Sequence, residues 1–487
     1  MLFSSLSFAL FFLLITCAYF AFPHRFRWGL LLGGSYFFYA CAGAKFLFWM
    51  IASTLVTYGA GLWMGKAGDR SRRKGVLLLS LAFNMGLLFV FKYVNFFTDS
   101  LGMVLSSLES SFRFSGFKLL LPVGISFYTF KNLSYTIDVY RGSLPPEKHL
   151  GLFALYVSFF PQVLAGPIER AGRLLPQFHE GHSFDYGRVT RGLKLMVWGL
   201  FQKMVIADNL AVWVDRVYGN PAQYPGIPLV VATFFFAFQI YCDFSGYSDI
   251  AIGGAEVMGF KTMDNFRRPY LATSISEFWR RWHISLSTWF RDYLYIPLGG
   301  NRVAIPRWYM NLLIVFLVCG LWHGASWTFV VWGGIHGLYL IFSLMTQSLR
   351  DRVCLRVGVD RWPNLKKAFR VLVTFFLVCL AWVFFRSNSL SEALSILSQG
   401  WVAWKDVFLW NVWERPPFGG PLRFEFLVGS ASIVLLIFVH VVQERFSWIE
   451  ILSRRPGWVR WPIYYAGVLA ILLLGNFGTK QFLYFQF

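Results

Sequence analysis

The stretch from Trp308 to Met345 reads WYMNLLIVFLVCGLWHGASWTFVVWGGIHGLYLIFSLM and contains no Asp, Glu, Lys or Arg. It is about twice as long as the roughly 20 apolar residues that one transmembrane helix requires, so it predicts two membrane-spanning helices joined by a short turn. Arginines flank both ends, at Arg302, Arg307, Arg350 and Arg352. Because basic loops stay in the cytoplasm, we expect the turn, which follows Trp322-His323-Gly324, to face the opposite side of the membrane.

Apolar runs of similar character recur along the rest of the chain. The complete set covers residues 2–22, 28–42, 46–64, 76–97, 119–138, 150–168, 190–214, 227–258, 308–323, 326–347, 368–385, 424–442 and 461–475. Several runs are short or interrupted by Gly and Pro, so we expect about 11–13 membrane helices, some of them broken or re-entrant. Irregular backbone at membrane depth is tolerated only beside protein or a water-filled cavity. The sequence therefore predicts an all-α polytopic membrane protein with an internal cavity.

Composition and charge also indicate a membrane protein. Of 487 residues, 56% are hydrophobic and only 14% are charged, whereas a soluble domain carries about 25% charged residues. The net charge of +21 sits in short loops between apolar runs, as at Lys66–Lys74. This distribution is typical of cytoplasmic loops and argues against nucleic acid as a partner. No long polar linker divides the chain, so we expect one membrane domain over residues 1–487, in contact with membrane lipids.

The sequence carries none of the common signatures of metal or nucleotide chemistry. It contains no P-loop, no G-x-S-x-G elbow and no H-E-x-x-H pair. Its six cysteines show no C-x-x-C spacing. We therefore expect free thiols, no metal site and no bound cofactor.

His323 stands in the middle of the uncharged stretch, between Gly320 and Gly324. An ionisable side chain is costly there and usually faces a cavity or a pathway. Imidazole titrates near neutrality, so it can accept a proton from a hydroxyl and return it to a leaving group. The alternative is a structural histidine bonded to a neighbouring carbonyl. For His336, in Trp332–Gly337, the flanking glycines also serve close helix packing, so a packing role and a catalytic role both stand open.

Residues 261–302 form the densest polar stretch inside the apolar context. Projected as one helix, Glu277–Tyr295 has a tryptophan-rich apolar face that includes Trp282 and His283. Arg280 lies on its flank. A basic helix with such a face is typical of the lipid headgroup layer. His283 either packs within this face or takes part in the chemistry, and the pattern alone leaves both interpretations open.

Two other segments place charged side chains at membrane depth. One contains Asp243 and Asp249, and the other contains Lys131 and Asp138. Asp249 and Glu256 are seven residues apart, so they share one helical face. Such groups can orient a catalytic histidine, line a polar tunnel, or pair with each other to hold helices together. The sequence does not decide among these three roles.

A set of short motifs occurs in order over most of the chain. They are Met1–Ser5 (MLFSS), Pro122–Phe127 (PVGISF), Gln162–Ile168 (QVLAGPI), Cys242–Asp249 (CDFSGYSD), Phe278–His283 (FWRRWH), Tyr295–Asn301 (YIPLGGN) and Leu321–Gly324 (LWHG). With this ordered set the chain resembles the membrane-bound O-acyltransferases, and within them the bacterial branch of the alginate O-acetyltransferase membrane subunit.

The resemblance implies a ring of helices around a central tunnel, with the catalytic core at about 119–347 and further helices at 363–487. It implies that His323 is the essential histidine and that His283 lies near the same passage. The residues that we expect to line the tunnel or position the donor are Asp243, Asp249, Trp282, Arg280, Arg281, Trp322 and His336. The loop 403–423 is where we expect partner choice to reside.

The hypothesis that follows is an O-acyltransferase in the bacterial cytoplasmic (inner) membrane. It moves an acyl group, which we expect to be acetyl, from a cytoplasmic thioester such as acetyl-CoA or an acyl carrier. The acceptor is a hydroxyl of an extracytoplasmic polysaccharide such as alginate, or of a periplasmic or membrane-anchored acetyltransferase partner protein. Relatives of the same core modify peptidoglycan, cellulose or teichoic acids, so the acceptor stays open. The rival hypotheses are a transporter or channel that uses intramembrane His and Asp, and a passive scaffold.

Overall fold

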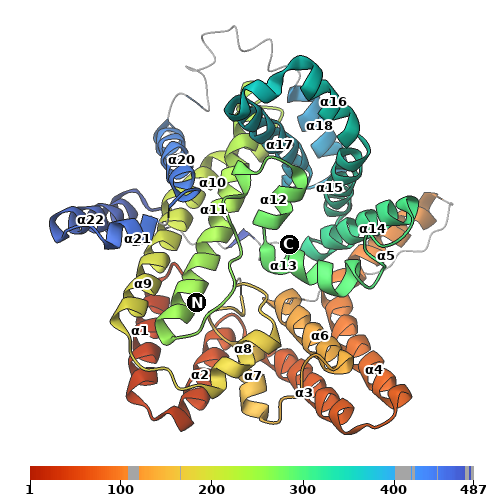
Figure 1. Ribbon diagram of the computed structural model, residues 1–487, viewed down its shortest axis with the longest axis vertical. Helices are drawn as coiled ribbons and strands as arrows, with labels where there is room; N and C mark the ends of the chain where they lie inside the picture. The colour runs from red at the N-terminus through yellow and green to blue at the C-terminus, as the bar shows by residue number, and fades with distance from the viewer. Residues whose placement is uncertain are drawn as a thin grey trace. The chain divides into compact units, whose positions relative to one another are not determined.

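The computed structural model describes residues 1–107, 120–164, 166–400, 418, 423–446, 448–477 and 482–483. Within these ranges the chain forms helices and no strand (Figure 1). The loop 403–423, to which we assigned partner choice, lies almost entirely outside the described residues. The prediction of an all-α protein is confirmed.

Nine helices in the described part of the chain are long and apolar enough to cross a membrane. They are Ala44–Lys66, Arg70–Leu105, Tyr186–Tyr218, Ile227–Met258, Ile305–His323, Trp327–Met345, Pro363–Arg386, Arg423–Gln443 and Gly457–Leu474. Each overlaps one of the predicted apolar runs. Many of their large apolar side chains are exposed, such as Leu79, Phe342 and Leu473, as expected for helices whose solvent is lipid. The protein is therefore a multi-pass membrane protein.

The helices divide into two compact units. The first unit comprises Met1–Leu193 and Ala251–Met263. Its helices are α1 (Leu6–Ala21), α2 (His24–Ala40), α3 (Ala44–Lys66), α4 (Arg70–Leu88), the π-helical turn η1 (Phe89–Tyr93), α5 (Val94–Ser107), α6 (Ile125–Arg141), α7 (Leu150–Ser158) and α8 (Ala171–His179), and the start of α9 (Tyr186–Leu200) and the end of α11 (Ile227–Met258) also belong to it.

Helices α3, α4 and α6 pack together inside the first unit (Figure 1). Polar side chains connect them. Asn84 accepts a hydrogen bond from Ser53 at 2.6 Å and donates one to Thr57 at 3.1 Å. Asn132 donates to the Ser53 hydroxyl at 2.7 Å. These buried groups hydrogen-bond one another across the three helices, which lowers the cost of placing them inside a membrane protein. One predicted run is broken here, because α7 ends at Ser158 and Pro161 follows, so 150–168 is not a continuous helix.

The second unit comprises Lys194–Ile250 and Asp264–Phe487. Besides its parts of α9 and α11, its elements are η2 (Phe201–Ala207), α10 (Asp208–Tyr218), η3 (Pro269–Leu271), α12 (Ile275–Arg281), α13 (Ile284–Phe290), η4 (Arg291–Tyr295), α14 (Ile305–His323), α15 (Trp327–Met345), α16 (Gln347–Val357), η5 (Val359–Arg361), α17 (Pro363–Arg386), α18 (Leu390–Gly400), α20 (Arg423–Gln443), α21 (Trp448–Ser453) and α22 (Gly457–Leu474). The predicted pair of helices in the uncharged stretch is confirmed as α14 and α15.

Glycines let the backbones of α14 and α15 touch. A Cβ atom on Gly320 would lie 2.2 Å from the carbonyl oxygen of Phe329, and a Cβ on Gly333 would lie 2.2 Å from that of Phe316. No side chain fits at such distances, so only glycine allows this approach. The contact lies one turn before His323 and fixes the end of α14 against α15.

The helix predicted over Glu277–Tyr295 is interrupted. Trp282 has an extended backbone and His283 has a left-handed one, with φ 41°, so α12 ends at Arg281 and α13 starts at Ile284. The break is held by the preceding loop, because the Ile284 amide donates to the Asn265 carbonyl at 2.9 Å. The tryptophans are also buried, with Trp282 fully enclosed. The prediction of one continuous helix over Glu277–Tyr295 is therefore wrong, and its tryptophans pack into the second unit.

Candidate active site

His323 is the last residue of α14, and its side chain is enclosed by aromatic rings. Its exposed fraction is 2%. The ring centroid lies 5.0 Å from those of Trp322 and Trp332 and 5.6 Å from that of Phe385. Dispersion contacts with these rings hold the imidazole in place and exclude bulk water from it.

His283 belongs to the same cluster. Its ring centroid lies 6.3 Å from that of His323 and 5.8 Å from that of Trp322. The break between α12 and α13 directs the ring of His283 toward Trp322 and His323. In a continuous helix this residue would instead lie on the same apolar face as Trp282. Two histidines that stand forty residues apart in the sequence are thereby brought together.

A chain of hydrogen bonds orients His283. Asn265 donates from Nδ2 to the Ser248 hydroxyl at 3.0 Å, which assigns its Oδ1 to the opposite side. This oxygen accepts from Ser285 at 2.9 Å and lies 3.1 Å from His283 Nδ1. Because an amide oxygen only accepts, the proton of His283 resides on Nδ1. Burial lowers the pKa of His283 to about 3, so its ring is neutral at pH 7.

His336 lies on α15 at the other side of Trp332. The Trp332 ring centroid is 5.0 Å from that of His323 and 5.1 Å from that of His336. His336 Nδ1 accepts a hydrogen bond from the Trp279 indole at 3.3 Å. The three histidines therefore share one aromatic cluster, and His336 joins it through indole contacts. In the described ranges, no three His, Cys, Asp or Glu side chains gather as a metal ion would require.

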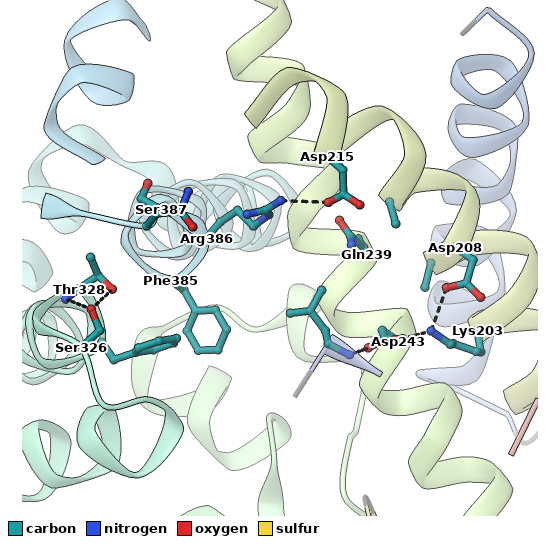
Figure 2. Close-up of a pocket in the computed structure, with 15 residues that line it drawn as sticks. Lys203, Asp208, Asp215, Gln239, Asp243, Ser326, Thr328, Phe385, Arg386 and Ser387 are labelled. Carbon is teal, nitrogen blue, oxygen red and sulfur yellow. Dashed lines mark hydrogen bonds and ion pairs between the residues drawn. The ribbon is translucent and has the colours of Figure 1, made fainter. Parts of the chain in front are cut away.

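A polar cavity of about 370 Å³ lies in the second unit beside this cluster (Figure 2). Its lining consists of Lys203, Ala207, Asp208, Ala211, Asp215, Gln239, Asp243, Ser326, Thr328, Phe329, Phe385, Arg386, Ser387, Asn388 and Leu483. The volume lies within the range of about 300–1,000 Å³ that is usual for small-molecule sites.

Phe385 connects the cavity with His323. Its ring contacts the imidazole, and the same side chain lines the cavity. Phe329, which also lines the cavity, packs against Phe385 with ring centroids 4.8 Å apart. His323 is not itself part of the lining, and Phe385 contacts both the imidazole and the cavity.

Ion pairs form the polar wall of the cavity. Lys203 is buried and contacts both Asp208, at 2.8 Å, and Asp243. The second oxygen of Asp243 accepts from the backbone amide of Leu483 at 2.8 Å. On the other wall, Arg386 pairs with Asp215 at 2.9 Å. Figure 2 shows both groups facing the same space.

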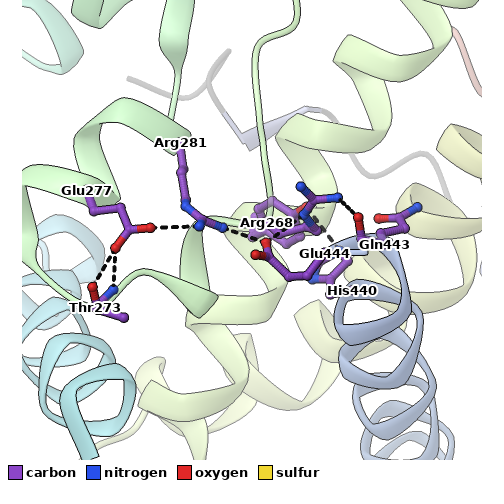
Figure 3. Close-up of polar contacts among 8 residues, drawn as sticks. Arg268, Thr273, Glu277, Arg281, His440, Gln443 and Glu444 are labelled. Atoms are coloured by element: carbon purple, nitrogen blue, oxygen red, sulfur yellow. Dashed lines mark hydrogen bonds and ion pairs between the residues drawn. The ribbon is translucent and has the colours of Figure 1, made fainter. Parts of the chain in front are cut away.

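Arg281, from the motif Phe278–His283, lies in a separate ion-pair network with Arg268 (Figure 3). Arg281 contacts Glu277 and Glu444 at 2.7 Å each, and Arg268 contacts Glu444 at 3.0 Å. Burial raises the pKa of Glu444, but the hydrogen bond and charge of Arg281 outweigh it and leave that pKa below its ordinary value. Arg280 is exposed and bonds to Ser276 at 3.0 Å. This network joins α12 to the end of α20.

The predicted site residues thus separate into groups. His323, His283, Trp322 and His336 lie in the aromatic cluster, and Trp282 is attached to it through Trp382, 5.1 Å away. Asp243 lines the cavity. Asp249 accepts from Gln202 at 2.8 Å and is not part of the cavity lining. Asp249 and Glu256 do not pair, because Glu256 binds Arg191 instead.

Sequence reasoning missed three residues of the cavity wall. Lys203 and Gln239 lie inside apolar runs that we assigned to membrane helices, and Arg386 directly follows another. A partial signal for Lys203 was present, since a lysine inside a membrane usually pairs with an acidic side chain. Asp208 lies five residues later, outside the i+3 and i+4 spacings of an α-helix, and the π-helical turn η2 brings the two together. Gln239 carries no charge and gave no such signal.

Comparison with known proteins identifies the family to which the chain belongs. The sequence model of the membrane-bound O-acyltransferase family matches residues 148–385, which contain the three clustered histidines. The chain is 40% identical to the probable alginate O-acetylase of Pseudomonas aeruginosa, over 85% of this chain and 76% of that protein. It is 36% identical to the peptidoglycan O-acetyltransferase of Helicobacter pylori, over 75% and 72%. It is 28% identical to the teichoic acid D-alanyltransferase of Streptococcus thermophilus, over 60% and 74%. The chain therefore belongs to the membrane-bound O-acyltransferase family and is a multi-pass O-acyltransferase.

Proposed function

We propose that the chain transfers an acetyl group from a thioester to a hydroxyl, with His323 as general base or as a transient acyl carrier. The observation that carries the proposal is the position of His323, which is buried in a ring cluster and contacts Phe385, a side chain that also lines a polar cavity. An imidazole next to such a cavity can accept the proton of a hydroxyl and return it to a leaving group.

As general base, His323 takes the proton of the acceptor hydroxyl while its oxygen attacks the thioester carbonyl. The carbon–sulfur bond then breaks, and the sulfur leaves with the proton from His323. One thioester and one alcohol become one ester and one thiol, so the reaction needs no further reactant. The aromatic enclosure supports this chemistry because water excluded from the acyl group cannot hydrolyse it.

His283 acts as a positioning residue in this proposal. Its neutral ring is held by Asn265 and stands 6.3 Å from His323, centroid to centroid. With the proton on Nδ1, its Nε2 is an acceptor. A neutral neighbour does not repel the imidazolium that His323 becomes during proton transfer, whereas a charged histidine at this distance would.

We assign the cavity to the acceptor. Ser326 and Thr328 line it, and they belong to the turn that the flanking arginines predict to face away from the cytoplasm. The acceptor class follows from the relatives, whose names specify alginate, peptidoglycan and teichoic acid. We therefore propose a polysaccharide of the cell envelope, reached directly or through a periplasmic partner protein, and a location in the bacterial inner membrane.

The donor is a thioester delivered from the cytoplasm, either acetyl-CoA or an acyl carrier. Both carry phosphate groups, so exposed cations attract them. The sequence led us to expect Arg280 and Arg281 to position the donor, but Arg281 is engaged with the carboxylates of Glu277 and Glu444. Arg280 is the exposed cation of the motif, and we now assign donor attraction to it.

The decisive experiment compares His323→Ala with the wild-type protein in membranes that contain a labelled acetyl thioester and the host polysaccharide. Alkali-labile acetate on the polysaccharide should fall at least about 100-fold, which is the usual contribution of a general base. His24→Ala makes the same change in the first unit and should leave the ester content unchanged. An ester content in His323→Ala equal to that of the wild type, at equal protein in the membrane, would refute the mechanism.

A further inference from the structure

The charged side chains that line the cavity are already engaged in ion pairs, with three carboxylates contacting two cations. Lys203 contacts Asp208 and Asp243, and Arg386 contacts Asp215. These are the two cations of the lining. A carboxylate that entered the cavity would have to compete with an existing partner, and it would leave its own hydration shell to do so.

The hydroxyl groups of the lining are occupied as well. Ser326 and Thr328 hydrogen-bond each other at 3.1 Å. Ser387 donates to the carbonyl of Val383 at 2.8 Å. Neither pair needs a ligand to be satisfied.

Gln239 differs from all of these groups. It is buried, with an exposed fraction of 3%, and its Oε1 is enclosed without a hydrogen-bond partner. It nevertheless lines the cavity, and Figure 2 shows its amide between Asp215 and Asp243 on the cavity wall. A buried polar atom without a partner costs about 1–3 kcal/mol, so its retention calls for an explanation.

We propose that Gln239 hydrogen-bonds the acceptor, and that the cavity accepts an uncharged hydroxyl-bearing group in preference to a uronate. The proposal rests on the proposed function, since it assumes that the cavity beside Phe385 is the acceptor site. The Oε1 end of Gln239 is enclosed by protein, so the Nε2 end is the one that can donate a hydrogen bond to the oxygen of an acceptor hydroxyl in the cavity. A carboxylate only accepts and brings a charge for which the cavity holds no available cation.

The test is equilibrium binding to the purified full-length chain, without donor. The two probes are β-1,4-linked mannotriose and the corresponding mannuronate trisaccharide, which share their ring hydroxyls and differ in the group at C6. Mannotriose should bind about tenfold more tightly or better, because its C6 hydroxymethyl group brings no buried charge. Gln239→Leu should weaken mannotriose binding about fivefold, the size expected for one neutral hydrogen bond.

The thermal midpoint separates a binding role from a structural one. Leucine fills the same space and removes an unsatisfied amide, so the Gln239→Leu midpoint should equal or exceed that of the wild type. Gln399→Leu makes the same change in α18, outside the cavity lining, and should bind both probes as the wild type does. Gln239→Glu offers a second variant of nearly identical shape and should also weaken mannotriose, since it loses the donor.

The proposal is overturned if the trisaccharides bind equally, if mannuronate binds more tightly, if neither binds, or if Gln239→Leu leaves mannotriose affinity unchanged. None of these results concerns the thioester chemistry. Acetate transfer that survives in His323→Ala would instead refute the proposed function, whatever the binding data show.

Discussion

Removal of the Lys203 ammonium group should destabilise the second unit strongly. Lys203 is 2% exposed and is the common partner of Asp208 and Asp243. Lys203→Met keeps the length of the side chain and removes only its charge and hydrogen bonds. The two carboxylates are then buried beside each other without the cation that joined them, which is the situation in which a broken buried ion pair is most costly.

The magnitude follows from the size of the unit. Breaking a buried pair from one side costs about 3–5 kcal/mol. The second unit contains roughly 280 residues, and at about 2.1 cal/mol/K per residue its unfolding entropy is about 0.6 kcal/mol/K. Each kcal/mol then lowers Tm by about 1.7 °C, so Lys203→Met should lower Tm by about 5–8 °C.

The assay is thermal unfolding of the detergent-solubilised protein, followed by tryptophan fluorescence. The triple variant with Lys203→Met, Asp208→Asn and Asp243→Asn removes all three charges together and should recover most of the lost Tm, because neutral amides do not repel each other. A Tm within about 1 °C of the wild type for Lys203→Met, or a triple variant less stable than the single one, would refute the argument.

Two further predictions concern the histidine cluster. Gly320→Ala should cost about 1–3 kcal/mol or more, since its Cβ would lie 2.2 Å from the Phe329 carbonyl, whereas Gly29→Ala meets nothing within 4 Å; equal Tm values for the two variants would contradict the backbone contact. Burial lowers the pKa of His283 to about 3, whereas the unfolded chain binds this proton with a pKa of about 6.5. The free energy of unfolding is therefore unaffected by this group above about pH 6.5, and it falls by about 1.4 kcal/mol per pH unit as the pH is lowered from there toward 3. Acid unfolding of His283→Asn should be correspondingly less steep between pH 6.5 and 4, and parallel curves would contradict the prediction.

The sequence predicted the fold well because lipid imposes simple rules on it. The nine helices able to span a membrane in the part of the chain that the structure describes follow from apolar length alone. The pair around His323 was evident from the absence of charge between Trp308 and Met345. Helix periodicity failed at His283. A continuous helix over Glu277–Tyr295 was the simplest interpretation, but hydrogen bonds from the distant loop at Asn265 stabilise a break. Such tertiary contacts leave no trace in local pattern.

The site was predicted in part for a similar reason. An isolated histidine in an apolar run is conspicuous, so His323 was found, and the motif around Trp282 led to His283. Lys203, Gln239 and Arg386 become a site only when η2, α11 and the end of α17 are placed around one cavity. Conversely, Arg281 was expected to position a donor, but its partner Glu444 follows it by more than 160 residues and no spacing rule connects them.

The ion pairs from Arg281 and Arg268 to Glu444, and the bond from the Leu483 amide to Asp243, tie the last part of the chain to the part matched by the family. A chimera that exchanges only the C-terminal helices between relatives would therefore lose two sets of contacts at once. One is the pair of ion pairs from Arg268 and Arg281 to Glu444, and the other is the hydrogen bond to Asp243 in the cavity wall. A functional chimera should therefore carry Glu444 together with Arg268 and Arg281, and the residue at position 483 should not be proline, so that its backbone N–H can donate to Asp243. The C-terminal helices of this protein therefore cannot be exchanged as an independent module.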